Sequence, residues 1–270
     1  MNLDAYLYSS RSIPLESARM FIVKRLRNLG WGKMADKEVV VDVGCGPGGT
    51  TRKLILPLFQ NCPRIFAMDA LPDMIKLAKK QNYSSQIAYS VANIEEWSSL
   101  ERWENQITKL VSILCFHWLK DQRKAFQNVY KLLQKGGEAA FFFALQTTFH
   151  ATILEMQMRS KWSHLFKEVE NYVPESQYKG HDASYYKKML EDMGFEVLYC
   201  KGEEKIDIFS SEEEFREFFT SICVLRKHVP PEQLKEFEND FIEALIQKNG
   251  RISGIPFHKG NFIEIVARKK

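Results

Sequence analysis

Short apolar runs alternate along the chain with segments in which apolar residues recur every third or fourth position. The runs predict seven strands, at residues 39–43, 64–68, 86–91, 109–115, 138–145, 195–200 and 262–267. The periodic segments predict helices, at residues 17–29, 50–59, 72–81, 122–133 and 185–193. Strands that alternate with helices are typical of a mostly parallel sheet. We therefore expect an α/β fold, a seven-stranded sheet with helices on both faces.

Three largely helical segments depart from this alternation. They are residues 1–37, 146–183 and 208–250. We expect a single domain over residues 1–270, with its core at 39–145, the first segment as an N-terminal lid and the other two as cap insertions. Gly136 and Gly137 are expected to end the helix that precedes the fifth strand. The last two strands are expected to form an antiparallel pair.

The composition is that of an ordinary globular protein, with 45% hydrophobic and 27% charged residues among 270. The formal net charge of +4 comes from 38 basic and 34 acidic residues and does not indicate nucleic-acid binding. No apolar run approaches about 18 residues, and the N-terminus lacks the pattern of a signal peptide, so we expect no membrane span. The five cysteines lack metal-ligand spacing, which predicts no metal and reduced thiols in a cytoplasmic protein.

The stretch VVVDVGCGPGGTT, at residues 39–51, fits the dinucleotide fingerprint G-x-G-x-x-G. Asp69 ends the next strand, where a carboxylate can accept hydrogen bonds from ribose hydroxyls. Both features suit a nicotinamide cofactor and an adenosyl sulfonium cofactor equally well. Asp42, two residues before Gly44, distinguishes between these two cofactors. A carboxylate there is unfavourable beside a diphosphate but tolerable beside the sulfonium and ammonium groups of S-adenosylmethionine.

With these residues the chain resembles the class I S-adenosylmethionine-dependent methyltransferases, which have a Rossmann-like fold. The matching segments are residues 42–48, 92–95 and 132–138, together with Asp69. By that resemblance Gly44, Gly46 and Gly48 back the cofactor, Asp69 holds the ribose, and Asn93 with Ile94 meets the adenine. Many members have Asp at the Asn93 position; the amide oxygen of Asn can still accept from the adenine amino group. The expected cofactor contacts also include Asp42, Cys45, Ala70 and Cys115.

The fourth predicted strand leads into His117 and Trp118, at the edge of the sheet where ligands of such folds bind. A His-Trp pair can serve packing as well as chemistry. Trp118 combines an indole N–H donor with a large apolar body, which suits a ligand that is mostly hydrocarbon with a polar end. His117 would act as a general base if the methyl acceptor were a hydroxyl or an amine.

The segments 115–138, 158–175 and 227–245 resemble those of the juvenile hormone acid O-methyltransferases of arthropods. The resemblance implies methyl esterification of farnesoic acid or a juvenile hormone acid, with Trp118 contacting the carboxylate. A carboxylate is ionised at pH 7, so this reaction needs no strong base. Phe116 and Trp162 are further expected substrate contacts, because aromatic residues of the cap are abundant enough to line a channel for a long hydrocarbon chain.

Two positions depart from that family. Pro14 stands where the family has a Gln that helps to hold the carboxylate, and Pro cannot donate a hydrogen bond. Arg11, Ser12 or Gln146 would replace it, or the substrate differs. The segment 223–229 also replaces an Asn-Pro pair of the family.

Two other functions stay open from the sequence. One is an N- or O-methyltransferase that acts on an amine, a phenol or another small metabolite. The other is a non-catalytic terpenoid-binding protein. In the preferred interpretation the partner is a small lipophilic acid, no nucleic acid is bound, and a homodimer is left open because some similar enzymes pair.

Overall fold

The computed structural model describes residues 4–11, 15–33 and 35–270. The chain divides into two compact units. Unit 1 contains residues 1–13, 144–181 and 203–262. Unit 2 contains residues 14–143, 182–202 and 263–270.

The strands confirm the predicted α/β sheet. They are β1 (Val40–Val43), β2 (Ile65–Asp69), β3 (Ile87–Val91), β4 (Ile107–Ile113), β5 (Leu133–Thr147), β6 (Phe195–Ile208), β7 (Arg251–Ile252) and β8 (Ile255–Lys269). Seven of them follow the order β3-β2-β1-β4-β5-β8-β6, and the two-residue β7 pairs with β8 in antiparallel fashion. The pairs among β1 to β5 are parallel. The carboxyl ends of these five strands therefore meet at one edge of the sheet.

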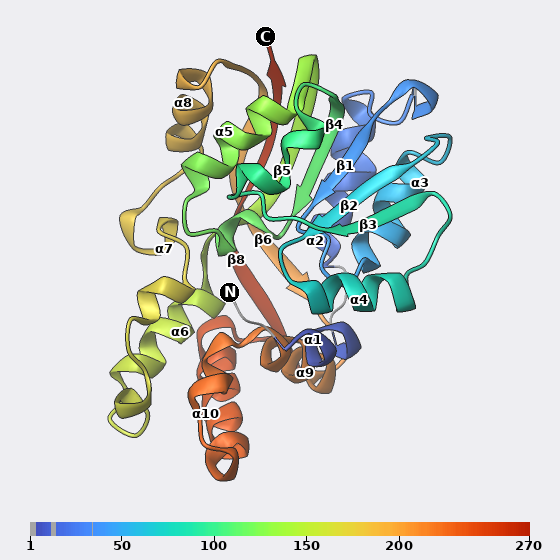
Figure 1. Ribbon diagram of the computed structural model, residues 1–270. Coiled ribbons are helices and arrows are strands. Elements are labelled where there is room, and N and C mark those ends of the chain that lie inside the picture. Colours follow the sequence, from blue (N-terminus) through green and yellow to red (C-terminus); the bar gives the residue numbers. More distant parts are fainter. Residues whose placement is uncertain (1–3, 12–14, 34) are drawn as a thin grey trace. The chain divides into compact units, whose positions relative to one another are not determined.

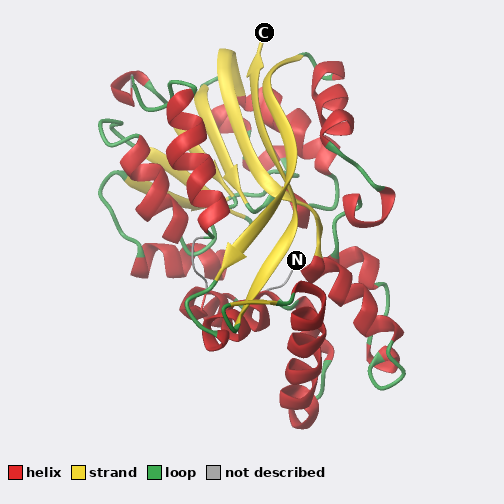
Figure 2. Cartoon of the chain, turned by 180° about the vertical axis from the view of Figure 1, so that it is seen from behind, coloured by secondary structure: helices red, strands yellow, loops and turns green. Residues whose placement is uncertain are grey.

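Unit 2 carries helices on both faces of its sheet (Figures 1 and 2). They are α2 (Glu16–Met20) with its π-helical continuation η1 (Phe21–Leu26), η3 (Thr51–Ile55) with α3 (Leu56–Leu58), α4 (Pro72–Gln81), α5 (Gln122–Leu132) and α8 (Ala183–Asp192). Three successive phenylalanines of β5 show how the faces are filled. The Phe142 ring stacks on Phe21 of η1, whereas Phe141 packs on Phe126 of α5 and Phe143 on Tyr186 of α8.

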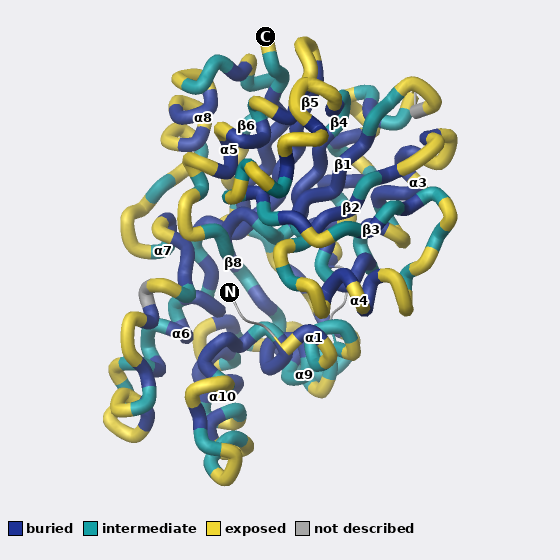
Figure 3. The backbone as a smooth tube through the Cα atoms, in the orientation of Figure 1, coloured by how far each residue is buried: buried dark blue, intermediate teal, exposed yellow. Residues whose placement is uncertain are grey.

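The middle of the sheet forms the core of unit 2. All four residues of β1 are buried, as is the run from the fifth to the thirteenth residue of β5 (Figure 3). Such continuous burial is expected of parallel strands that are covered on both faces. The loops that follow the strands are therefore anchored to a tightly packed sheet.

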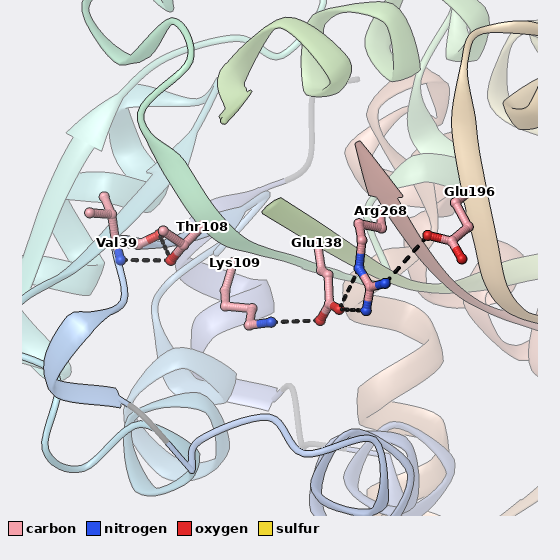
Figure 4. Close-up of polar contacts among 6 residues, drawn as sticks. All are labelled: Val39, Thr108, Lys109, Glu138, Glu196 and Arg268. Carbon is pink, nitrogen blue, oxygen red and sulfur yellow. Dashed lines mark hydrogen bonds and ion pairs between the residues drawn. The ribbon is translucent and has the colours of Figure 1, made fainter. Parts of the chain in front are cut away.

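A chain of ion pairs crosses four neighbouring strands of unit 2 (Figure 4). Lys109 of β4 lies 2.6 Å from Glu138 of β5, which accepts from Arg268 of β8 at 2.8 Å; Arg268 also lies 3.3 Å from Glu196 of β6. The order of these residues repeats the order β4-β5-β8-β6 of the strands. Glu138 is 7% exposed, so the chain of charges is built into the sheet rather than laid on its surface.

One predicted boundary is wrong. Helix α5 ends at Leu132 and the chain enters β5 directly, so Gly136 and Gly137 do not end the helix. They lie where the pairing of β5 with β4 shifts register, and Gly136 has φ +78°. A Cβ on Gly137 would lie 2.6 Å from the carbonyl oxygen of Ile107. The glycines therefore serve a bulge in a strand, which sequence spacing alone does not distinguish from a helix end.

Unit 1 contains the other described α-helices. They are α1 (Ala5–Arg11), α6 (Thr148–Met158), α7 (Ser176–Lys179), α9 (Glu212–Ile222) and α10 (Leu234–Asn249). The segment 208–250, which the sequence predicts to be largely helical, contains α9 and α10. Aromatic rings join these helices: Phe149 of α6 packs on Phe219 of α9 and on Phe241 of α10. In the described part of the chain no helix combines the length and the apolar character needed to cross a bilayer.

Short 3₁₀ turns complete the chain. They are η2 (Ala35–Lys37), η4 (Trp97–Ser99), η5 (Glu101–Trp103), η6 (Phe116–Trp118), η7 (Ser163–Leu165), η8 (Val169–Tyr172), η9 (Val224–His228) and η10 (Pro231–Gln233). Of these, η6 directly follows β4 and holds the His-Trp pair singled out in the sequence.

Candidate functional site

The glycine loop leaves β1 and folds onto the end of β2. The amide groups of Gly44 and Cys45 both donate to the carbonyl oxygen of Met68, at 2.8 and 3.0 Å. Gly46 N–H donates to the carboxylate of Asp69 at 2.9 Å. Gly44, Gly46 and Gly48 have φ of +77°, +54° and +83°, a region that glycine adopts most readily. The motif thus forms the strand-to-helix turn that the sequence predicts.

The glycines of this loop differ in how much space a side chain would have. A Cβ on Gly44 would lie 2.3 Å from Cys115 Sγ, and a Cβ on Gly48 would lie 2.6 Å from Tyr89 Oη. A Cβ on Gly49 would meet no atom within 4 Å. In a dinucleotide fingerprint the third glycine permits close packing of helix on strand. Open space at Gly49 therefore argues against a dinucleotide site and for the D-x-G-x-G-x-G interpretation.

Asp42 lies at the base of this loop with 2% of its surface exposed. Its carboxylate accepts a hydrogen bond of 2.6 Å from the Thr51 hydroxyl. Burial raises the pKa of Asp42 to about 7, against the Thr51 hydrogen bond and with a smaller contribution from the negative charge of Asp69. No lysine or arginine of the described residues is in ion-pair contact with it. A cationic ligand at this loop would stabilise its charged form.

Asp69 closes β2 and organises two backbone groups. One carboxylate oxygen accepts from Gly46 N–H and the other from Leu71 N–H, each at 2.9 Å. The second bond fixes the turn that contains Ala70, the residue between Asp69 and Leu71. Burial raises the pKa of Asp69 in spite of these bonds. Each oxygen keeps a second lone pair, which fits the predicted acceptance of ribose hydroxyls.

The segment after β3 is fixed by its own side chains. Asn93 Oδ1 accepts from Glu95 N–H and its amide group donates to Glu96, both at 3.0 Å. The carbonyl oxygen of Ile94 accepts from Asn128 of α5 at 2.8 Å. Asn128 is not among the residues predicted from the sequence, although a polar residue among the apolar positions of an amphipathic helix could have signalled it. The adenine contact of Asn93 and Ile94 stays a prediction.

A strained residue turns the chain at the end of β4. Leu114 has φ +55°, which is rare for a leucine, while its N–H donates to the carbonyl oxygen of Phe142 at 2.7 Å. Cys115 follows it and packs on Gly44. Burial raises the pKa of the Cys115 and Cys45 thiols, so both stay protonated at neutral pH. The turn brings the segment after β4 against the glycine loop, as the topology requires.

The His-Trp pair lies in η6 on the far side of this turn. Phe116 is fully buried against Phe126 and Phe141, which gives it a packing role. Burial lowers the pKa of His117 to about 3, so its ring is neutral at physiological pH. The partly exposed Trp118 lies beside it, with ring centroids 4.8 Å apart. Of the predicted substrate contacts in unit 2, Trp118 is thus the one with accessible surface.

The other predicted substrate contacts that the structure describes belong to unit 1. Gln146 donates to the carbonyl oxygens of Ser176 and His181, and the Trp162 indole N–H donates to Asp240 at 2.9 Å. Arg11 lies 3.7 Å from Glu217 and lines a cavity of about 160 Å³ with side chains of α9 and α10. Ser12 and Pro14 lie outside the described residues. The polar groups of Gln146 and Trp162 therefore already have partners within unit 1.

Comparison with known sequences places these features in a wider group. Residues 41–141 match a family model described as a methyltransferase domain. The juvenile hormone acid O-methyltransferase of Drosophila melanogaster is 20% identical over 251 residues, which cover 92% of this chain and 84% of that protein. Its counterpart from Bombyx mori is 22% identical, over 90% of this chain and 86% of its own. A malonyl-[acyl-carrier protein] O-methyltransferase from Paenibacillus is 27% identical, over 78% and 73%.

Solved structures support the fold. A Bacillus halodurans protein described as a putative methyltransferase superposes with a TM-score of 0.57 at 19% identity, over 91% of this chain and 98% of that one. A Haemonchus contortus phosphoethanolamine N-methyltransferase 2 in complex with S-adenosyl-L-methionine gives 0.54 at 15% identity, over 98% of this chain and 56% of that one. At these identities the likeness establishes the fold alone.

Proposed function

Because the chain belongs to the class I S-adenosylmethionine-dependent O-methyltransferases, we propose that it methylates the carboxylate of a lipophilic acid, such as farnesoic acid or a juvenile hormone acid. The observation that carries the proposal is the pair His117 and Trp118 directly after β4. One member is a buried, neutral imidazole, and the other is a partly exposed indole. The two relatives named for an acid substrate cover 92% and 90% of the chain and agree with this choice.

The residues after β1 and β2 fit the cofactor. S-adenosylmethionine supplies an electrophilic methyl group when bound. The glycine loop would back it, Asp69 would accept from its ribose hydroxyls, and Asp42 would place a negative charge beneath its positively charged end. The carboxylate of Asp42 is buried and has no ion-pair partner among the described residues, which suits a cation and disfavours a diphosphate.

A carboxylate that accepts the methyl group needs to be positioned by the protein but does not need to lose a proton to it. A carboxylate is already ionised at pH 7 and can attack a methyl group without a base. His117, whose pKa is lowered to about 3, is a weak base and fits such a substrate better than an alcohol or an amine. The protein's task is then to orient the carboxylate and exclude water from it. In this proposal the Trp118 indole N–H donates to a carboxylate oxygen of the acid.

A substrate panel tests this directly. The purified chain would be incubated with methyl-labelled S-adenosylmethionine and, separately, with lipophilic acids, phenols and amines of similar size. We expect labelled methyl esters from the acids, cleaved by mild alkali. Label found only in phenols or amines would overturn the proposal. Binding of the acids without any methyl transfer would favour a terpenoid-binding protein instead.

Two substitutions assign the roles of the pair. Trp118→Phe keeps an aromatic ring and removes the N–H, so kcat/KM for the acid should fall about 10-fold or more, as expected for a lost hydrogen bond to a charge. Trp97→Phe, at a partly exposed indole beside Lys131, is the matched control and should leave kcat/KM unchanged. His117→Ala should lower kcat for an acid far less than a general base would require, about 100-fold or more. A loss of that size would contradict the ester assignment.

A further inference from the structure

We propose that Asn82 and Tyr89 form a relay that holds the glycine loop in its cofactor-binding shape, which makes both of them positioning residues for S-adenosylmethionine. Neither residue belongs to the motif, and neither is assigned a role by the resemblance. The relay lies wholly in unit 2. It depends on the cofactor and not on the identity of the acid substrate.

The first link joins the loop to helix α4. Asn82 is the residue immediately after α4, and its backbone N–H still donates to Ala78 at 2.9 Å. Its side-chain amide donates to the carbonyl oxygen of Pro47 at 2.7 Å, across 35 positions of sequence. Pro47 is buried and has no N–H of its own, so its carbonyl is the one backbone group with which it can hydrogen-bond. The peptide that Pro47 forms with Gly48 is thus held at both ends, by Asn82 at the carbonyl and through Gly48 N–H, which donates to the carbonyl oxygen of Cys45 at 3.0 Å.

The second link joins Asn82 to strand β3. Tyr89 is 8% exposed, and its hydroxyl donates to the backbone carbonyl oxygen of Asn82 at 3.0 Å. The same hydroxyl lies 2.6 Å from where a Cβ on Gly48 would be. Tyr89 therefore does two things: it fixes the backbone from which the Asn82 amide reaches Pro47, and its ring end supports Gly48.

The third point of support comes from β2. Tyr89 of β3 pairs with Ala67 of β2, and β2 ends in Asp69, which holds Gly46 at 2.9 Å. Three consecutive loop residues thus rest on three different elements: Gly46 on β2, Pro47 on α4 through Asn82, and Gly48 on β3 through Tyr89.

Such bracing matters because the loop is rich in glycine. Gly46 and Gly48 have φ of +54° and +83°, and glycine reaches many other conformations at little cost. Without the relay, a larger share of the molecules would hold the loop in shapes that do not fit the cofactor. Apparent affinity falls in proportion to the fraction of molecules in the competent shape. The relay should therefore act on cofactor affinity.

Calorimetric titration with S-adenosylhomocysteine tests the relay without any substrate. Asn82→Ala should weaken binding about 10-fold and Tyr89→Phe about 3- to 5-fold, the size of one lost hydrogen bond or less. Because Tyr89 acts through Asn82, the double variant should bind about as weakly as Asn82→Ala alone rather than show the product of the two effects. Tyr89→Ala, which also removes the support of Gly48, should bind more weakly than Tyr89→Phe.

Tyr83→Phe is the matched control, since it removes a hydroxyl from a neighbouring tyrosine that is 73% exposed; it should bind like the parent protein. Thermal unfolding of each variant without ligand separates positioning from stability. Lower melting temperatures with unchanged dissociation constants would overturn the relay. Independent, multiplying effects of the two substitutions on affinity would overturn it as well. If no acid is methylated but these affinities change as stated, the relay stands and the proposed substrate does not.

Discussion

Two carboxylates in the sheet of unit 2 are almost equally buried but differ in their partners. Glu138 of β5, 7% exposed, lies between Lys109 and Arg268. Asp42 of β1, 2% exposed, accepts a hydrogen bond from the Thr51 hydroxyl and has no ion-pair partner among the described residues. A buried charge is tolerated when it is paired and costs free energy when it is not. The comparison separates a carboxylate that completes the fold from one that we propose interacts with a ligand.

The pH dependence of stability has opposite signs at the two sites. Burial alone would raise the pKa of Glu138, but the hydrogen bonds from Lys109 and Arg268 lower it below 4.5. Its contribution to stability is present above that value and is lost as the pH falls through the lowered pKa. The pKa of Asp42 is raised from 3.8 to about 7. Its contribution is present at low pH and is lost as the pH rises from about 4 to about 7.

The largest effect on stability is expected from removing Glu138, the carboxylate that is paired with two basic side chains. Glu138→Ala leaves Lys109 and Arg268 without their common partner, and we expect the free energy of unfolding to fall by about 2–3 kcal/mol at pH 7. Denaturant titration measures it. Glu196→Gln, at the exposed end of the same chain of charges, should change it by no more than about 0.5 kcal/mol. Equal effects of the two substitutions would mean that the network is only a surface feature.

The next effect is on binding rather than on stability. Asp42→Asn keeps the size of the side chain and an acceptor for Thr51 but removes the charge. The dissociation constant for S-adenosylmethionine should rise about 10-fold, the size of one lost charge interaction. The free energy of unfolding at pH 8 should not fall, because the buried charge is no longer formed. Calorimetry and denaturant titration on the same samples decide between this outcome and a structural role for Asp42.

The smallest effect concerns the other end of β4, the strand that carries Lys109. Leu114 follows this strand with φ +55°, and asparagine tolerates that region better than leucine. Leu114→Asn should raise the free energy of unfolding by about 1 kcal/mol. Leu119→Asn, at a leucine with φ −77°, serves as control and should give no gain. A loss of stability in Leu114→Asn would show that side-chain packing outweighs backbone strain there.

Local patterns in the sequence were enough to predict what depends on neighbouring residues. The helix over residues 72–81 has those bounds in the structure, because Pro72 starts it and its periodicity is regular. Asp42 and Asp69 could be placed at the candidate site because they lie at or next to the carboxyl ends of two neighbouring parallel strands, β1 and β2. The cofactor follows from the same motifs.

Contacts between distant segments could not be predicted in this way. The Asn82 side chain reaches Pro47 across 35 positions of sequence, and Tyr89 supports Gly48 across 41 positions. Nothing in the local pattern of a strand tyrosine marks it as the neighbour of a glycine. Likewise, Gly136 and Gly137 look like a helix end, yet the pairing of β5 with β4 gives them their role. Such positions are set by tertiary structure and overrule local preference.

The central claim is that the loop above Asp42 binds a cationic sulfur nucleotide. Titration with S-adenosylmethionine at pH 7, in buffers of different ionisation enthalpy, counts the protons exchanged on binding. With a pKa of about 7, Asp42 is half protonated in the free protein, so binding should release about half a proton. The Asp42→Asn variant should release clearly less, because the group that titrates near this pH is gone. An absence of binding, or equal proton release by both proteins, would contradict the account.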